Sequence, residues 1–460
     1  MTRAFPYWSA LLKGASGAAL AAALAGPARA DPAPDYSANL FGDLSGFREV
    51  FAKVGGSLNV TETSEAFADP HSRLARGTNY DGLTTMTVQI DTKPALNWGG
   101  GQFNASLVNL HSDNYSARYI GALQTISGVQ GDRATRLWEL WYDQKIGETF
   151  DVKIGQQSLD IEFAQHPSAG YFVNSLFGWP AQLALDLPAG GPAFPLSALG
   201  VRGKYSAGAV TLLGGVFSGS PAPASNDPDP QHANPYGLRF PVRGALAIGE
   251  AQYAINQGEG GYAGVYKVGG WWDSLSFNDL RYNGAGQPLA DPASNRTPAS
   301  HHGNFGVYAI GEQMVWRGSD KARTLSVFLR TNVAPLSDRN LSTFGINGGL
   351  ALHDPLPGRA ADTFVVGFGR QHLGAAVMGA SLDAAAYNPG VFTPRRKDET
   401  VFEANYQYQA TPWMQIPCLS GCYPHPLNVG WAHSPEYSPS NVGATAPPAI
   451  PSSERNALKG

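Results

Sequence analysis

The chain has 460 residues, a formal net charge of −4 and only 15% charged residues. This balance gives no basic face, so nucleic acid is not an expected partner. The mean hydropathy of −0.20 and the lack of long apolar runs after the first thirty residues exclude helical membrane spans. Strands that alternate apolar and polar residues remain possible, because their average hydropathy is near neutral.

The first thirty residues have the pattern of a secretory signal peptide. Basic Arg3 and Lys13 flank its start, Ala15 to Ala25 is rich in Ala, Leu and Gly, and Ala28-Arg29-Ala30 forms a small-x-small cleavage pattern. An N-terminal membrane anchor is the weaker alternative, because the apolar stretch is shorter than the ~20 residues that span a bilayer. We therefore expect export with removal of residues 1–30, and a short periplasmic segment over 31–52.

Alternating runs recur from there to Ile416. We predict fourteen strands, near residues 54–62, 82–92, 101–111, 135–146, 149–157, 197–206, 208–218, 244–256, 262–273, 304–316, 322–333, 341–352, 361–371 and 399–410. In the last, Phe402, Ala404, Tyr406 and Tyr408 lie on one side, and Glu403, Asn405, Gln407 and Gln409 on the other. One side suits lipid and the other suits water. The pattern predicts an all-β fold, an antiparallel transmembrane β-barrel over residues 53–416 with a polar lumen.

Two further strands support outer faces of this kind. Met86, Val88 and Ile90 alternate with Thr85, Thr87 and Gln89, and Leu325, Val327 and Leu329 alternate with Ser326, Phe328 and Arg330. Aromatic residues near predicted strand ends are expected in interfacial girdles. These residues are Trp98, Trp138, Tyr142, Trp271, Trp272, Trp316 and Trp413. The alternative is that they are core aromatics of a soluble β-sandwich.

The long stretch from Asp160 to Leu199 is expected to fold into the pore and narrow it, because loops of this length are usually functional. Irregular backbone is tolerated at membrane depth only where it lines water or packs on protein. Its candidate sugar-contacting residues are Asp160, Glu162, Tyr171, Asn174, Trp179 and Asp186. The alternative is a surface loop with scattered polar residues.

Strand residues next to this stretch are also pore candidates. We expect Glu139 to face the lumen, with Trp141 on the same face and Trp138, Leu140 and Tyr142 on the other. Lys153 then points inward as well, between Val152 and Ile154. Arg136 has the opposite parity from Glu139 and needs a bend at the strand start to reach the pore.

Three segments share a pattern with a known family. They are Leu40-Phe41-Gly42-Asp43 through Arg48; Arg136-Leu137-Trp138-Glu139-Leu140-Trp141-Tyr142 with Val152 to Gln156; and Phe172 through Trp179-Pro180, with Asp186-Leu187-Pro188, Gly190 to Leu196 and Gly200-Val201-Arg202. Over roughly residues 40–415 the chain resembles the carbohydrate-selective porin family (OprB-like) of Gram-negative outer membranes.

The resemblance implies a sixteen-stranded outer-membrane porin for passive diffusion of monosaccharides such as glucose. It implies Arg48 and Arg202 as basic pore residues by motif position, and small neutral sugars, outer-membrane lipid and the barrel-assembly machinery as partners. No cofactor or metal and no enzymatic activity is expected. Association of pores into a homo-oligomer is left open. Charged and aromatic lumen residues suit sugar hydroxyls and C–H faces without tight binding.

Other functions are less well supported by the residues. His301-His302 has no partner at metal-ligand spacing, and Asp160 with Glu162 resembles a glycosidase pair only by composition. The main alternative is a secreted glycan-binding or structural β-protein that never enters a membrane. It predicts polar outer surfaces, against which the sets around Met86 and Leu325 argue.

After Ile416 the alternation stops. Residues 417–460 are Pro-rich and hold both cysteines, and proline is excluded from interior strands. We expect Met414 to Ile416 to begin a fifteenth strand that Pro417 interrupts, leaving the last one or two strands missing and an aberrant, disordered tail. A reading-frame shift near codon 417, giving a non-functional truncated porin, is our interpretation; an unusual periplasmic extension is the alternative.

Overall fold

The computed structural model describes residues 36–69, 77–112, 116, 122–227, 229–258, 260–319, 322–390 and 397–422. The expected signal peptide and residues 423–460 of the expected tail lie outside these ranges. In the described part, none of the helices has the length and apolar character needed to cross a bilayer.

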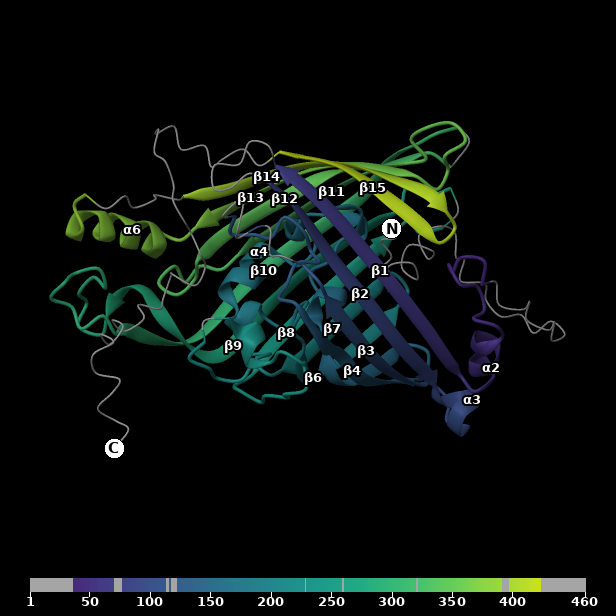
Figure 1. Ribbon diagram of the computed structural model, residues 1–460, viewed down its shortest axis with the longest axis horizontal. Helices are drawn as coiled ribbons and strands as arrows, with labels where there is room; N and C mark the ends of the chain where they lie inside the picture. The colour runs from purple at the N-terminus through teal and green to yellow at the C-terminus, as the bar shows by residue number, and fades with distance from the viewer. Residues whose placement is uncertain are drawn as a thin grey trace.

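One antiparallel sheet of 15 strands dominates the structure, and each strand pairs with the next along the chain. The strands are β1 (Gly56–Asp69), β2 (Gly77–Asp91), β3 (Gly101–Leu110), β4 (Ala134–Ile146), β5 (Phe150–Gln157), β6 (Ala198–Ala207), β7 (Val210–Phe217), β8 (Leu246–Ile255), β9 (Gly264–Asn283), β10 (Pro298–Arg317), β11 (Thr324–Val333), β12 (Ser342–His353), β13 (Thr363–Leu373), β14 (Asp398–Thr411) and β15 (Met414–Cys422). The sheet curls into a barrel-shaped wall (Figure 1). The predicted all-β antiparallel fold is confirmed, and each of the fourteen predicted strands is present.

The connections differ between the two ends of the strands. Within the described residues, one end has short turns such as 147–149 and 208–209, whereas the other has the long segments 158–197, 218–245 and 374–397. The helices are α2 (Phe47–Lys53), α3 (Thr92–Leu96), α4 (Ala181–Asp186), α5 (Pro230–Ala233) and α6 (Ala375–Tyr387). This asymmetry is typical of outer-membrane barrels.

The two faces of the sheet separate as the alternation predicts. On β14, Phe402 is 48% exposed, while Glu403, Asn405 and Gln407 on the inner face are buried. On β2, Met86 is 41% exposed and its neighbour Thr85 is buried. Apolar side chains therefore cover the outside of the wall and polar ones its inside, which is the reverse of a soluble protein.

The girdle prediction was wrong for Trp138 and Trp271, which are 3% and 4% exposed. Ser106 pairs with Glu139 and Leu107 pairs with Leu137, so Trp138 is the extra residue of a β-bulge on β4. The bulge turns Trp138 inward, away from the face of Leu140, and also brings Arg136 inside. Trp271 faces inward because its neighbour Trp272 occupies the outer face.

Two strand ends also differ from the sequence prediction. β15 continues through Pro417 to Cys422 instead of stopping at Ile416, with Pro417 opposite Gln407. Within the described sheet β15 is an edge strand. Proline lacks a backbone N–H, and an edge strand has no second neighbouring strand that needs this hydrogen-bond donor. β9 and β10 extend beyond the predicted strands toward the long-loop end, where Asn278 pairs with Ser300.

Candidate permeation site

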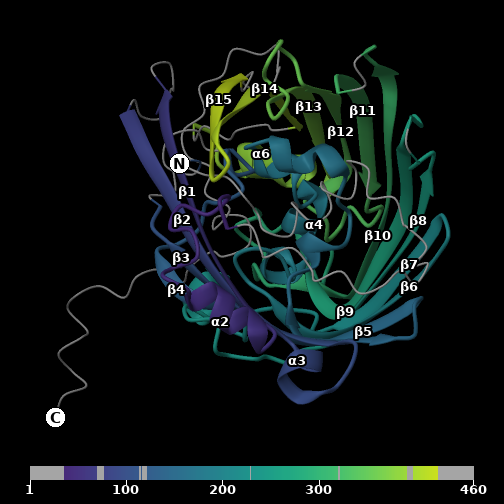
Figure 2. The same ribbon diagram turned by 90° about the vertical axis from the view of Figure 1, so that its right-hand side faces the viewer.

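The segment between β5 and β6, residues 158–197, lies inside the curved sheet, where α4 is visible between the walls (Figure 2). We call it the inner loop. It consists of short 3-10 turns, η2 (Leu159–Ile161), η3 (Pro167–Tyr171), η4 (Ser175–Phe177) and η5 (Pro188–Gly190), with α4 between the last two. Such tight, irregular backbone leaves many N–H and C=O groups without helical partners, so the wall must supply their hydrogen-bond partners.

Glutamates of the wall accept hydrogen bonds from the backbone of the inner loop. Glu250 on β8 accepts from Ala164 N at 2.7 Å. Glu312 on β10 accepts from Ser168 N at 2.9 Å and from its hydroxyl at 2.7 Å. Glu403 on β14 accepts from the backbone N–H groups of residues 173 and 174, at 2.6 and 2.9 Å. Charged acceptors make the stronger class of hydrogen bond, so these residues fix the loop in place.

A buried arginine on β11 donates hydrogen bonds to backbone carbonyl groups of the inner loop. Arg330 donates to the carbonyl oxygens of Ala164 at 2.8 Å and Gly178 at 2.6 Å, and also to that of Leu176. The amides of Asn405 and Gln407 donate to the Tyr171 carbonyl at 2.7 and 2.9 Å. Because these donors come from β11 and β14, the loop is attached to the wall far from its own ends.

Apolar contacts complete the attachment. The rings of Phe172 and Phe177 stack with centroids 4.0 Å apart, and Phe328 of β11 meets Phe172 edge-on at 5.5 Å. Glycine in β13 provides the room: a Cβ atom at Gly369 would overlap Leu176, and one at Gly367 would overlap both phenylalanines. Glycine in a strand often marks such close approach of another segment.

A charged cluster forms where the start of the inner loop meets β4, β5 and β6. Arg202 pairs with Asp151, with Glu162 Oε2 at 2.7 Å and with Asp143 Oδ2 at 3.5 Å. Lys153 also pairs with Glu162. Although burial alone would raise it, Lys153 and Arg202 lower the pKa of Glu162 to about 2. We call these five residues the ionic cluster.

An aromatic face adjoins the ionic cluster. Lys153 Nζ lies 4.4 Å from the ring centroid of Trp141 on the neighbouring strand. The side chains of Glu162 and Asp143 keep 21% and 20% of their surface exposed. Trp141 itself is only 6% exposed, so the partly exposed side chains of Glu162 and Asp143 are the groups that can meet sugar hydroxyls.

Glu139 faces the interior, as expected, but it is almost fully buried. Its carboxylate accepts a hydrogen bond from Ser158 N at 3.1 Å, at the start of the inner loop. The neighbouring Asp160 accepts from Ser158 Oγ at 2.5 Å and from Phe194 N at 3.0 Å. Glu139 therefore joins the start of the inner loop to the wall instead of facing the lumen water, and Asp160 joins the two ends of the loop to each other.

Four other candidates of the loop also have structural partners. Asn174 caps η4 by accepting from Leu176 N at 2.9 Å. Asp186 is buried and accepts from Ser342 N at 3.1 Å, and burial raises its pKa well above the usual value. Trp179 donates to the Gly190 carbonyl at 3.2 Å. The Tyr171 ring lies edge-on to His353 at 5.3 Å.

Arg48 does not join the other candidates. It lies in α2, outside the sheet order, and its guanidinium donates to the carbonyl of Leu58 on β1 at 2.6 Å. The structure thus brings together Trp141, Lys153, Glu162 and Arg202, and places Arg48 at the beginning of the first strand.

Sequence reasoning missed the wall residues that hold the inner loop: Glu250, Glu312, Arg330 and Glu403. It placed Glu403 and Arg330 on the water-facing side, so alternation carried part of the signal. A charged residue at an inward position in the middle of a strand, surrounded by apolar outward neighbours, is the pattern that could have identified all four.

Comparison with known proteins agrees with this arrangement. The OprB family of carbohydrate-selective porins matches residues 75–417. A high-pH structure of Pseudomonas putida OprB has a TM-score of 0.73 and 22% identity, covering 84% of this chain and 93% of that one. A low-pH structure of Pseudomonas putida OprB has a TM-score of 0.52 and 16% identity, covering 84% and 94%. No curated protein sequence matches.

An antiparallel wall with an apolar outside, a polar inside and a long loop folded into it defines a porin of the outer-membrane β-barrel class. The family match extends this conclusion, since it covers most of the chain. The chain belongs to the carbohydrate-selective porin family OprB.

Proposed function

We propose that this porin passes neutral monosaccharides, glucose among them, by passive diffusion past the ionic cluster and Trp141. The supporting observation is the partly exposed side chain of Glu162, which pairs with Arg202 and with Lys153, the residue that lies over the Trp141 ring. Fixed charges offer hydrogen bonds to hydroxyl groups, while their mutual pairing keeps the site from holding any one solute tightly.

Size selection follows from the inner loop. Because wall residues on β8, β10, β11 and β14 hold it inside the sheet, the loop narrows the path through the barrel. Exclusion of disaccharides is the consequence. The proposal includes export with cleavage after residue 30 and insertion into outer-membrane lipid by the barrel-assembly machinery.

Liposome swelling tests the proposal. The purified protein is reconstituted, and the swelling rates in glucose, xylose, sucrose and maltose are compared at equal osmolarity, with protein-free liposomes as the blank. We expect both monosaccharides to enter faster than both disaccharides. Equal rates for the two classes, or no swelling above the blank, would contradict a monosaccharide-selective pore.

The alternative of a secreted glycan-binding protein makes a different prediction. Such a protein would stay soluble without detergent, whereas the apolar outer face around Met86, Leu140 and Leu329 requires detergent or lipid. Solubility of the purified protein after detergent removal separates the two functions before any transport is measured.

A further inference from the structure

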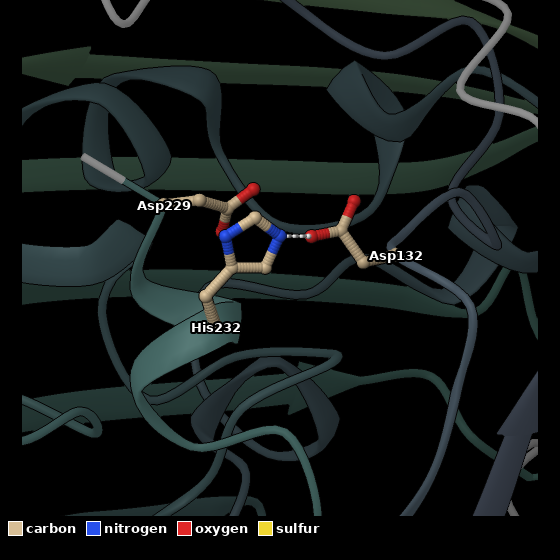
Figure 3. Close-up of side chains that lie close together, drawn as sticks. All are labelled: Asp132, Asp229 and His232. Atoms are coloured by element: carbon tan, nitrogen blue, oxygen red, sulfur yellow. Dashed lines mark ion pairs between the residues drawn. The ribbon is translucent and has the colours of Figure 1, made fainter. Parts of the chain in front are cut away.

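Two of the long loops meet at a group of metal-ligating side chains that the permeation path does not use. Asp132 lies two residues before β4, and Asp229 and His232 belong to the β7–β8 connection, at the start of and within α5. One potential ligand atom from each lies within 4.8 Å of the others. Figure 3 shows the imidazole beside both carboxylates, with an ion pair to Asp132.

The orientation of the imidazole directs its two nitrogens to different carboxylates. His232 Nδ1 lies 3.0 Å from Asp227 Oδ2, and Nε2 lies 3.2 Å from Asp132 Oδ2. A histidine that binds a metal usually donates its other ring N–H to a carboxylate, which fixes its tautomer. Asp227 holds His232 in this way, with Nε2 directed to the remaining carboxylates.

A second observation comes from the buried side of the group. Arg136 is 1% exposed, and its Nε and Nη1 atoms have no hydrogen-bond partner among the described residues. The charges that act on its guanidinium are those of Asp132 and Asp229. Two buried, unpaired donor nitrogens beside two carboxylates indicate an acceptor outside the protein, such as a water oxygen, and a water held by a bound metal ion would supply one.

The charges fit a divalent cation. Asp132, Asp227 and Asp229 provide three negative charges against the single positive charge of Arg136 once His232 has lost its proton to bind the ion. We propose that Asp132, Asp229 and His232 Nε2 bind one divalent transition metal ion of the Zn²⁺ type, with Asp227 as the positioning residue. The mixed nitrogen and oxygen ligands favour such an ion over Ca²⁺ or Mg²⁺, which prefer oxygen ligands alone.

The bound ion would join the β3–β4 and β7–β8 connections. These are already linked by the hydrogen bond from Asp132 N to Gln231 Oε1 at 3.0 Å. Ala233 of α5 also packs with Leu196 of the inner loop. Metal binding would therefore reduce local opening of α5 and the residues just before β4.

The test uses the full chain in detergent, with Zn²⁺ as the probe in a calorimetric titration at pH 7.5. We expect one saturable site, loss of that site in H232A, and affinity reduced about tenfold or more in D227N. H301A is the matched control, because His301 also contacts two aspartates, Asp279 at 2.8 Å and Asp338 at 3.7 Å. It should bind Zn²⁺ as the parent protein does.

Hydrogen exchange of residues 229–233 is a second measurement, independent of the calorimetric signal. Zn²⁺ should slow this exchange in the parent and in H301A, but not in H232A. D132N provides a second ligand variant should H232A fold poorly. The proposal is overturned by Zn²⁺ binding that is equal in H232A, D132N and the parent, or by Ca²⁺ binding with higher affinity than Zn²⁺.

Discussion

Inward-facing acidic side chains of this porin have two roles, and their partners distinguish them. Glu250, Glu312 and Glu403 accept hydrogen bonds from backbone N–H groups of the inner loop. Glu162 and Asp143 instead face Arg202 and keep part of their surface in water. Substitution of the first kind should change loop position, whereas substitution of the second should change the charge of the pore.

Arg202→Ala should make the channel more cation-selective, because it leaves Asp143, Asp151 and Glu162 with Lys153 as their remaining partner in the ionic cluster. Each lost charge-assisted hydrogen bond is worth about 1.5–3 kcal/mol, so some loss of stability is also expected. The reversal potential in a KCl gradient measures the selectivity.

Arg370→Ala is the control for this variant, since Arg370 is largely exposed and pairs with Asp398 away from the cluster. It should leave the reversal potential unchanged. An Arg202→Ala channel with the parent's reversal potential would place the ionic cluster outside the permeation path.

Met86→Arg should destabilise the folded barrel by about 2–4 kcal/mol if the residue lies near the bilayer midplane. Met86 points outward from β2 and is 41% exposed, so a charge there would meet hydrocarbon. Urea unfolding in lipid vesicles measures the effect, with Met86→Leu as the volume-matched control. Equal midpoints for the two variants would show that Met86 does not face the membrane core.

At the scale of elements, alternation predicted the strands well because one face of each strand meets lipid and the other meets protein or water. It could not predict the bulge at Trp138, since a bulge is defined by the partner strand, where Ser106 and Leu107 face Glu139 and Leu137. The attachment of the inner loop was missed for the same reason: Val173 and Glu403 are distant in sequence.

Glu403→Ala should loosen the inner loop, because it removes two charge-assisted hydrogen bonds at 2.6 and 2.9 Å. At about 1.5–3 kcal/mol each, their loss should make opening of the loop measurable. We expect faster swelling of liposomes in disaccharides and faster proteolysis within residues 158–197. Glu148→Gln, in an exposed turn, is the control and should change neither the swelling rate nor the proteolysis. Disaccharide swelling rates in Glu403→Ala that equal the parent's would argue against attachment of the inner loop by Glu403.

The inner loop should also be sensitive to acid through His166. Burial lowers the pKa of His166 to about 4, although Glu312 opposes the shift. The unfolded chain binds this proton below about pH 6.5, whereas the folded loop binds it only near pH 4. The contribution of neutral His166 to the free energy of unfolding is therefore fully present above about pH 6.5. It falls as the pH drops toward 4, by up to about 3 kcal/mol.

His166→Phe should remove this acid sensitivity and keep the stacking on Phe328, whose ring centroid lies 4.1 Å from that of His166. Urea midpoints at pH 7 and pH 4.5 measure it, with the exposed His302→Gln as the control. A pH dependence that is the same in all three proteins would assign the acid response to other groups.

At the scale of the whole molecule, the wall and the inner loop depend on each other. The loop's irregular backbone is stable at membrane depth only because the wall satisfies it, and the wall's buried charges are stable only because the loop pairs with them. Arg330 illustrates both, since its three carbonyl partners all belong to the loop.

The seam between β1 and β15 should be the least stable part of the wall. Each of these strands has one neighbour in the described sheet, whereas β7 pairs with both β6 and β8. Unpaired backbone groups in lipid cost several kcal/mol each, so fluctuations should concentrate there. Hydrogen exchange in nanodiscs should be about tenfold faster or more in β1 and β15 than in β7, a difference of ~1.4 kcal/mol or more. Equal protection in all three strands would show that the seam is closed in the membrane.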